Sequence, residues 1–191
     1  INETEILDLL QVIDGSKEDE NLLGFLDYDK IKEGKMCRHM VMVLPYCASC
    51  DAMEELLSKR KDTFKNLGEY EIINISGVDA AKTYKKPSDI KNKIKECEAL
   101  NKKTITLTVN RMLTGSTVEQ WDTMLYFKDT SSPQEYDQSI FRLQNQYIRT
   151  LSSANGFIKE NLKPQTLLVD FDPNRLFRIC LLYTSPSPRD A

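Results

Sequence analysis

Short, almost continuous apolar runs recur along this chain and constrain its fold more than any other feature. The first is Met40 to Tyr46, and apolar or β-branched residues dominate four later segments: Tyr70 to Gly77, Lys103 to Asn110, Thr123 to Asp129 and Thr166 to Asp172. A run of this kind, without polar alternation, is typical of a strand that is buried on both faces. Such strands occur in parallel sheets that are covered by helices on each side.

Helical patterns separate these runs. Amphipathic periodicity predicts helices over Ala52 to Phe64, Asp89 to Leu100 and Ser132 to Leu151, where Ser132 and Pro133 form a good helix start. Two shorter helices are expected earlier, over Ile1 to Gly15 and Asn21 to Gly34. Strands that alternate with helices indicate the α/β class with a mostly parallel sheet, in which ligands bind at the carboxyl ends of the strands.

The composition excludes several classes of protein. Hydrophobic residues make up 40% and charged residues 29% of the 191 residues, as in ordinary globular domains. A formal net charge of -3 argues against a basic DNA-binding module, so any nucleic-acid contact has to come from a local patch or from a missing neighbouring domain. No segment has the pattern of a membrane span or of a signal peptide. The five irregularly spaced cysteines favour reduced thiols and a cytoplasmic location over a disulfide framework.

The two ends of the chain are expected to lie outside the main domain. Residues 1–35 are interpreted as a helical lead-in from an upstream region, and residues 36–179 as the α/β domain. Residues 180–191 combine Pro and Ser without periodicity, which favours disorder. Their sequence, CLLYTSPSPRDA, also resembles the translation of a transposase adapter that is used in sequencing libraries. We therefore expect a non-native tail without defined packing.

Three segments carry the functional pattern. Arg38 to Leu57 is a strand, a turn and a helix, and Thr104 to Phe127 is a strand that ends in a Thr-Gly loop before the next strand. Tyr136 to Gln144, with the sequence YDQSIFRLQ, lies on the following helix. This ordered set, which spans roughly residues 38–147, resembles motifs IV, V and VI in the second RecA-like lobe of superfamily 2 helicases and translocases. The residues of these segments look most like those of the motor subunits of type III-like and related restriction-modification systems.

The resemblance implies a RecA-like three-layer fold and a part in ATP-driven movement along DNA. Gln138 and Arg142 match the first and fifth positions of motif VI, Q-x-x-G-R-x-G-R. An arginine at this place neutralises the charge that develops on the γ-phosphate, and its planar fork holds phosphate through two N–H groups. Gln138 shares a helix face with Arg142 and can hydrogen-bond phosphate or water. We therefore expect both residues to contact ATP and to act in catalysis.

The Thr-Gly loop corresponds to motif V in this resemblance. Thr114, Ser116 and Thr117 offer hydroxyl and backbone N–H groups that suit a DNA phosphate backbone, where contacts position rather than specify. Gly115 is assigned to the nucleotide site. The implied partners are double-stranded DNA, the first RecA-like lobe of the same polypeptide, and attached nuclease or methylase modules.

The chain departs from the family pattern at several positions. Phe141 and Gln144 replace the two glycines of motif VI, Asn145 replaces its second arginine, and Thr117 stands where an acid often follows the motif V glycine. Arg149 lies too far along the predicted helix to replace that arginine. The sequence contains no G-x-x-x-x-G-K-[ST] phosphate loop and no Asp-Glu box. ATP and Mg²⁺ would therefore be held mainly by the missing first lobe, and this chain is expected to be inactive alone.

Other functions fit parts of the sequence. Cys47 and Cys50 stand between a buried strand and a helix, as in thioredoxin-like oxidoreductases, where the helix N-terminus favours the reactive thiolate. Against this reading, no later strand begins with a proline that would face the pair. Zinc binding would need two further ligands. Packing of both cysteines as small apolar residues stays open, as does a non-catalytic interaction domain.

A few single residues have simpler expected roles. Trp121 is expected in the core, and the lone His39 is not expected to bind a ligand. Arg142 has the alternative of ion pairs with acids of its own helix. Asp170 and Asp172, at the end of the last predicted strand, are expected to face solvent.

Overall fold

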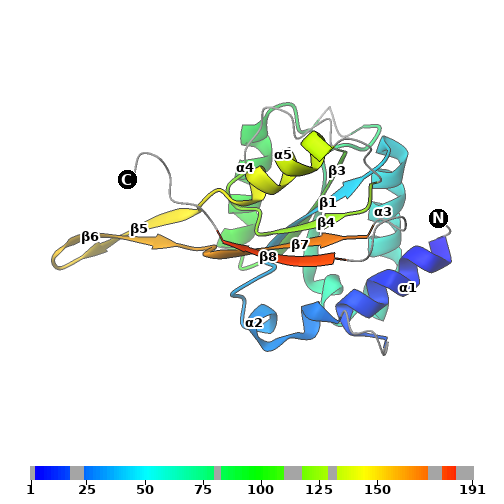
Figure 1. Ribbon diagram of the computed structural model, residues 1–191, viewed down its shortest axis with the longest axis horizontal. Coiled ribbons are helices and arrows are strands. Elements are labelled where there is room, and N and C mark those ends of the chain that lie inside the picture. The colour runs from blue at the N-terminus through cyan, green and yellow to red at the C-terminus, as the bar shows by residue number, and fades with distance from the viewer. Residues whose placement is uncertain are drawn as a thin grey trace.

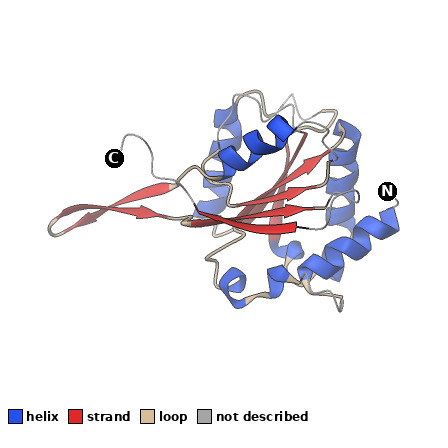
Figure 2. Ribbon diagram, in the orientation of Figure 1, coloured by secondary structure: helices blue, strands red, loops and turns tan. Residues whose placement is uncertain are grey.

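A six-stranded sheet with helices on both faces forms the body of the protein (Figures 1 and 2). The computed structural model describes residues 3–17, 24–79, 83–109, 118–128, 133–171 and 178–183. The described strands are β1 (His39–Leu44), β2 (Tyr70–Asn74), β3 (Lys103–Val109), β4 (Thr123–Tyr126), β5 (Ile148–Ser153), β6 (Gly156–Asn161), β7 (Gln165–Asp170) and β8 (Arg178–Tyr183). The described α-helices are α1 (Glu3–Asp14), α2 (Asp29–Lys32), α3 (Cys47–Lys59), α4 (Pro87–Ala99) and α5 (Pro133–Leu143). Short 3₁₀ helices cover Phe25–Asp27, Lys61–Thr63 and Leu67–Glu69.

The sheet confirms the expected α/β class. Its strand order is β2-β3-β1-β4-β7-β8, and the first five strands run parallel. The five predicted apolar runs are these five parallel strands, each matching its predicted range to within a few residues. They are buried because helices cover both faces of the sheet, which is why polar alternation is missing from their sequences.

Alternate side chains of the strands belong to two hydrophobic clusters, one on each face of the sheet. Met40, Met42 and Leu44 of β1 pack with α1, α2 and α3, whereas Val41 and Val43 pack with α4 and α5. Helices, sheet and helices thus form three layers (Figure 2). Trp121 is 2% exposed in the second cluster, which confirms its expected place in the core.

The lead-in helices belong to the first of these clusters. Leu10 and Ile13 of α1 and Ile31 of α2 are buried together with the side chains of β1 and α3. Asp14, which ends α1, is fully buried and accepts hydrogen bonds from the backbone N–H groups of Lys65, Asn66 and Leu67 at 2.7, 2.8 and 2.6 Å. Residues 3–17 therefore pack on the sheet, while the domain boundary after residue 35 stays a prediction.

The helix predicted over Ser132 to Leu151 is too long. α5 ends at Leu143, and β5 and β6 form an antiparallel hairpin that projects from the body as an arm (Figure 1). The hairpin turns at Ala154 and Asn155, and Gly156, which pairs with Ser153 directly after the turn, has a φ of 117° that favours glycine. Asn-Gly between β-type segments is a strong hairpin signal, and the sequence analysis missed it.

Two further expectations about the end of the chain are wrong. Residues 180–183, expected to lack defined packing, belong to β8, which pairs antiparallel with β7. The run RICLLY is β-prone and supplies a partner for the otherwise open edge of β7. Asp170, in β7 between β4 and β8, is only 2% exposed instead of facing solvent. Asp172 and residues 184–191 lie outside the described residues.

Candidate functional site

The carboxyl edge of the sheet collects the segments that carry the functional pattern. β1 lies between β3 and β4, and Leu44 pairs with Val109 while Val43 pairs with Tyr126, so these three strands end side by side. The turn into α3, the 110–117 segment and the segment that leads to α5 all leave from these ends. The described strand ends from which the three segments start thus lie side by side, at the edge where parallel sheets bind ligands.

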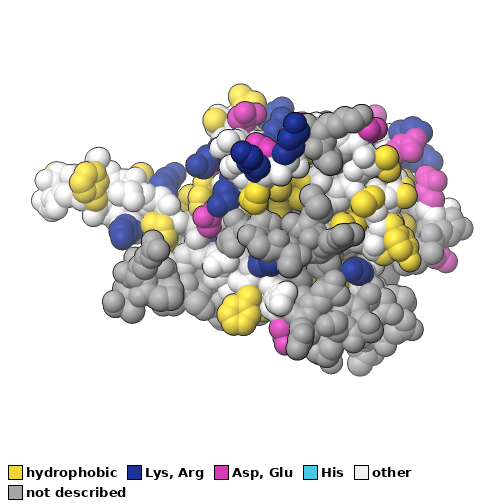
Figure 3. All heavy atoms as spheres, turned by 90° about the horizontal axis from the view of Figure 1, so that it is seen from above, with side chains coloured by type: hydrophobic (Ala, Val, Ile, Leu, Met, Phe, Trp, Pro, Cys, Tyr) yellow, Lys and Arg dark blue, Asp and Glu magenta, His cyan; other side chains and the backbone are white. Residues whose placement is uncertain are grey.

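α5 carries the two residues expected to contact ATP. Gln138 is exposed and Arg142 is half-buried, and their spacing of four residues puts them on one helix face. Partial burial lowers the pKa of the Arg142 guanidinium. The Arg142 carbonyl accepts a hydrogen bond from Asn145 Nδ2 at 3.1 Å. Arg142 is therefore partly accessible, and its role stays a prediction. Figure 3 shows several Lys and Arg side chains on the face of the molecule that is seen from above.

The Thr-Gly loop lies outside the described residues. Thr114, Gly115, Ser116 and Thr117 fall between Val109, where β3 ends, and Val118. Their assigned contacts with DNA and nucleotide thus stay predictions. Arg149, which was considered as a second arginine of motif VI, lies on β5 and pairs with Glu160 at 2.7 Å.

A polar cluster that the sequence analysis missed holds the loop after β2 beside β3. Asn74 Nδ2 donates to Asp51 Oδ1 at 2.9 Å and to Glu54 Oε2 at 2.8 Å, and Asp51 Oδ2 accepts the N–H of Val78 at 3.0 Å. The Asn74 side-chain oxygen accepts the N–H of Gly77 at 2.8 Å. α3 begins at Cys47 with Tyr46 as its N-cap, so Asp51 lies inside the helix and not at its N-terminus. The Asp51 carboxylate instead accepts a hydrogen bond from the loop after β2.

The end of this loop is joined to the exit of β3. The hydroxyls of Ser76 and Thr108 lie 3.1 Å apart, and Ser76 Oγ accepts the N–H of Val109 at 3.1 Å. A Cβ at Gly77 would clash with the Asp51 carboxylate, so a larger residue at this position would require that side chain to move. Hydrogen bonds thus join the loop after β2 to the end of β3, which directly precedes the 110–117 segment.

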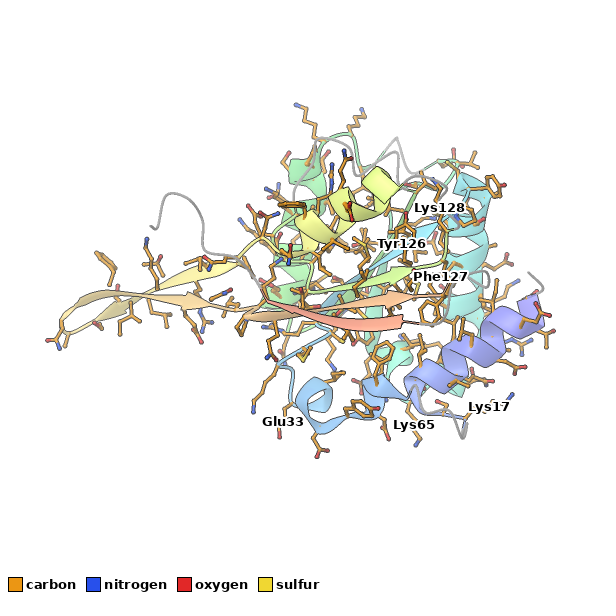
Figure 4. All side chains as sticks on the ribbon, viewed as in Figure 1. Lys17, Glu33, Lys65, Tyr126, Phe127 and Lys128 are labelled. Carbon is orange, nitrogen blue, oxygen red and sulfur yellow. The ribbon has the colours of Figure 1, made fainter. Side chains whose placement is uncertain are left out.

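A groove of about 1030 Å³ opens at the same edge, on the face that α1 and α3 cover. Its floor includes Phe127 and Phe171, whose rings stack with centroids 4.7 Å apart. Figure 4 shows Phe127 directly after β4, between Tyr126 and Lys128. Apolar side chains of α1 and α3 form the walls, and Tyr46, 72% exposed, stands at the rim. Its residues come from five separate segments, and no local pattern marks such a groove.

A second polar network lies at the opposite, amino edge of the sheet. His39 is 3% exposed, and its Nδ1 and Nε2 lie 2.8 Å from Thr104 Oγ1 and from Glu98 Oε1. The Tyr147 hydroxyl donates to Glu98 Oε2 at 2.9 Å. Burial opposes ionisation of Glu98, but the hydrogen bonds from His39 and Tyr147 hold its pKa below the usual value. Both ring nitrogens of His39 thus have hydrogen-bond partners inside the fold.

Asp122 anchors the start of β1 at this amino edge. Its carboxylate accepts the N–H groups of Arg38 at 2.9 Å and of His39 at 3.3 Å. Burial raises the pKa of Asp122, although His39 and these hydrogen bonds oppose the rise. The network supports the strands and lies away from the edge that carries Arg142.

Lys163 is a buried cation between α5, β4 and the arm. It is 3% exposed, and its Nζ donates to the carbonyl oxygens of Trp121 at 2.8 Å and Leu143 at 3.2 Å. Burial lowers the pKa of Lys163 to about 8, against the attraction of Asp122 and Glu119. Leu143 ends α5, so the ammonium group caps the helix that bears Arg142.

Four cysteines are free thiols: Cys37, Cys47, Cys50 and Cys97. Cys47 is exposed on the first turn of α3, whereas Cys50 on the same turn is fully buried in the core. Burial and the neighbouring Cys47 raise the pKa of the Cys50 thiol to about 12. Cys37 and Cys97 are also buried. The described residues contain no group of three or more His, Cys, Asp or Glu side chains that could hold a metal ion.

Comparison with known proteins points to restriction-modification enzymes. No protein-family model matches the chain. The chain is 29% identical over 153 residues to a protein of Mycoplasma pneumoniae that is named as a candidate type II restriction enzyme and methyltransferase, C-terminus. The match covers 80% of this chain and 20% of that relative, so the chain spans about a fifth of the relative's length. None of the described helices is long and apolar enough to cross a membrane.

Proposed function

We propose that this chain is the second RecA-like lobe of an ATP-dependent DNA helicase or translocase in a restriction-type system. The observation that carries the proposal is the adjacency of β3, β1 and β4, because each is followed by one of the three motif-like segments. The similarity to a candidate restriction enzyme and methyltransferase supports the type of system. The chain spans about a fifth of that relative's length, and in this proposal the activity belongs to a longer protein that contains it.

In this proposal, Arg142 completes the ATP site from outside the first lobe. Arginine suits this work because it stays charged and presents a planar pair of N–H groups to phosphate oxygens. A cation at this place stabilises the negative charge that develops on the transferred phosphoryl group. Gln138, one turn earlier, orients phosphate or water on the same face. Mg²⁺, which bridges the phosphates when ATP is bound, would be held by the first lobe, as would most of the nucleotide.

The 110–117 segment is proposed as the DNA contact of this lobe. Thr114, Ser116 and Thr117 would donate to phosphate oxygens of double-stranded DNA, and Gly115 would lie near the nucleotide. The rigid loop after β2 supports this role, because Ser76 fixes the exit of β3 just before the segment begins. Nuclease or methylase modules of the same polypeptide are the further partners in this scheme, and a cytoplasmic location agrees with the free thiols.

Redox catalysis by Cys47 and Cys50 is the weaker alternative. A dithiol enzyme needs both sulfurs to exchange with a substrate, and a nucleophilic cysteine acts as the thiolate. Cys50 is fully buried and its thiol pKa is raised to about 12. The pair therefore fits packing at a strand-helix corner better than thiol exchange.

The decisive experiment compares arginine variants in the full-length gene product. Arg142→Ala should lower the DNA-stimulated ATPase rate by about 10³- to 10⁵-fold, as expected for an arginine finger. Arg142→Lys should rescue poorly because an ammonium group lacks the planar fork. ATP binding and DNA binding should both survive. Arg149→Ala is the matched control, because Arg149 lies on the arm and pairs with Glu160.

Two results would contradict the proposal. One is an Arg142→Ala variant that keeps the parent ATPase rate while the protein is demonstrably a DNA-dependent ATPase. The other is an intact gene that encodes no phosphate loop upstream of this region, because a second lobe has no function without a first.

A further inference from the structure

The β5–β6 arm exposes both of its faces. Residues 148–160 are all exposed, and no described residue of another strand pairs with either outer edge of the hairpin. Phe157 is 80% exposed, Ile158 56%, Leu151 40% and Ile148 38%. Figures 1 and 3 show the arm projecting well clear of the helices. A two-stranded hairpin without packing is only marginally stable in water, so this arm is built to meet a partner.

The root of the arm is firmly held, in contrast to its exposed length. Leu162 N–H donates to the Tyr147 carbonyl at 2.8 Å, and the Tyr147 hydroxyl reaches Glu98 at 2.9 Å. The next residue, Lys163, is buried and bonded to the end of α5. A partner that binds the arm is thus connected rigidly to the body.

The chemistry of the arm favours a protein partner over nucleic acid. Residues 148–161 contain two basic residues and one acidic residue, and Arg149 is paired with Glu160. Binding to nucleic acid relies on several cations that neutralise phosphates, and an excess of one positive charge does not supply them. Four large apolar side chains and two outer edges that no other described strand covers are instead the features of β-edge pairing between proteins.

The outer edge of β6 is self-complementary. If β6 of two copies pair antiparallel about a twofold axis at Ile158, that residue faces its own counterpart. Since Leu151 is opposite Ile158 within each arm, an apolar row of Leu, Ile, Ile and Leu then crosses one face of a four-stranded sheet. On the other face, the same register puts Phe157 opposite Lys159 of the second copy, which is a favourable cation–aromatic pair. No like charges meet.

We propose that the arm is a self-association surface, through which two copies of this chain form a four-stranded antiparallel sheet by pairing along β6. The inference stands independently of the motor function, because it rests on the arm alone. The twofold arrangement also removes the two β6 edges from water, which is the usual way to protect an exposed strand edge.

The first test is sedimentation equilibrium of the 191-residue chain over a wide concentration range. The parent chain should shift from its monomer mass of 22.0 kDa toward twice that value as concentration rises. Ile158→Lys should weaken the dimer at least about tenfold, because it places two ammonium groups opposite each other at the axis. Val78→Lys is the matched control, since Val78 is 75% exposed at the far edge of the sheet, and it should associate like the parent.

The second test detects the register directly. In a Cys47→Ser, Cys180→Ser background, Ile158→Cys should form a disulfide-linked dimer on mild oxidation, because the two sulfurs meet at the axis. Thr150→Cys in the same background should not, because two strands would separate the two positions by about 14 Å, beyond the reach of a disulfide.

The outcomes are distinct. A parent chain that stays monomeric at all concentrations overturns the proposal, as does cross-linking of Thr150→Cys in place of Ile158→Cys. A monomer that binds duplex DNA and loses that binding on Phe157→Ala also overturns it, in favour of a nucleic-acid contact. A dimer that Ile158→Lys leaves intact assigns self-association to another surface and refutes pairing along β6.

Discussion

Replacing Lys163 with methionine should change how the stability of the protein depends on pH. Lys163 is 3% exposed and its ammonium group donates to two backbone carbonyls without a carboxylate in hydrogen-bond contact among the described residues. Burial lowers its pKa from the ordinary 10.5 to about 8, while Asp122 and Glu119 pull the pKa upward. The folded protein therefore holds this proton less tightly than the unfolded chain does.

The sign and size of the effect follow from proton linkage. Between about pH 8 and 10.5 the unfolded chain binds more protons at this residue than the folded chain, so the free energy of unfolding rises with pH. Below pH 8 the whole cost of burying the charge is present, about 3 kcal/mol, since each tenfold change in proton affinity is worth about 1.4 kcal/mol. From pH 7 to pH 9.5 the contribution recovers by about 2 kcal/mol. The neutral amine can still donate both hydrogen bonds, so the contacts survive deprotonation.

The assay is urea unfolding followed by the fluorescence of Trp121, the only tryptophan of the chain. The difference in unfolding free energy between parent and Lys163→Met should grow by about 2 kcal/mol in favour of the parent from pH 7 to pH 9.5. Lys95→Met, on the exposed face of α4, is the matched control and should stay within about 0.5 kcal/mol of the parent. Parent and Lys163→Met curves that run parallel across this range would refute the reasoning.

Two further outcomes are expected from buried groups. Asp14→Ala should destabilise the chain by about 3 kcal/mol or more in urea unfolding, because three backbone N–H groups lose their buried acceptor, and a loss below about 1 kcal/mol would contradict this account. In a Cys180→Ser background, a chromogenic disulfide reagent should label Cys47 in the folded protein and Cys50 only in urea, because Cys50 is buried with a thiol pKa near 12. Rapid labelling of Cys50 in the folded chain, together with insulin reduction that Cys47→Ser abolishes, would restore the redox interpretation.

The sequence was least informative where an element has no buried face. Each residue of β5 and β6 from 148 to 160 is exposed, so the hairpin lacks the contrast between apolar and polar positions that marks other elements. The periodicity of α5 was therefore extended over β5. Only the Asn155-Gly156 pair, which spans the end of the turn and the start of β6, indicated the hairpin, through its backbone conformation and not through burial.

The apolar runs alone determined the class of the fold and its core. β1, β3 and β4 were recognisable because strands that are buried on both faces consist mainly of apolar residues. The helices α3 and α4 were recognisable because the apolar residues on one side of each helix pack against the sheet. The order of motif-like segments also lies in the sequence, because it is a property of chain order. The pairing of Gln138 with Arg142 on one face follows from helix geometry alone.

Only the tertiary structure decided which distant residues meet. The strand order placed β1 between β3 and β4, and the partners of Lys163 lie 20 and 42 residues away in sequence. Sheet order and buried polar contacts depend on which surfaces become adjacent after all helices and strands have packed, and no local pattern encodes that adjacency. For the same reason, Asp170 was expected to be an ordinary solvent-facing acid at a strand end, whereas the packed structure leaves it only 2% exposed.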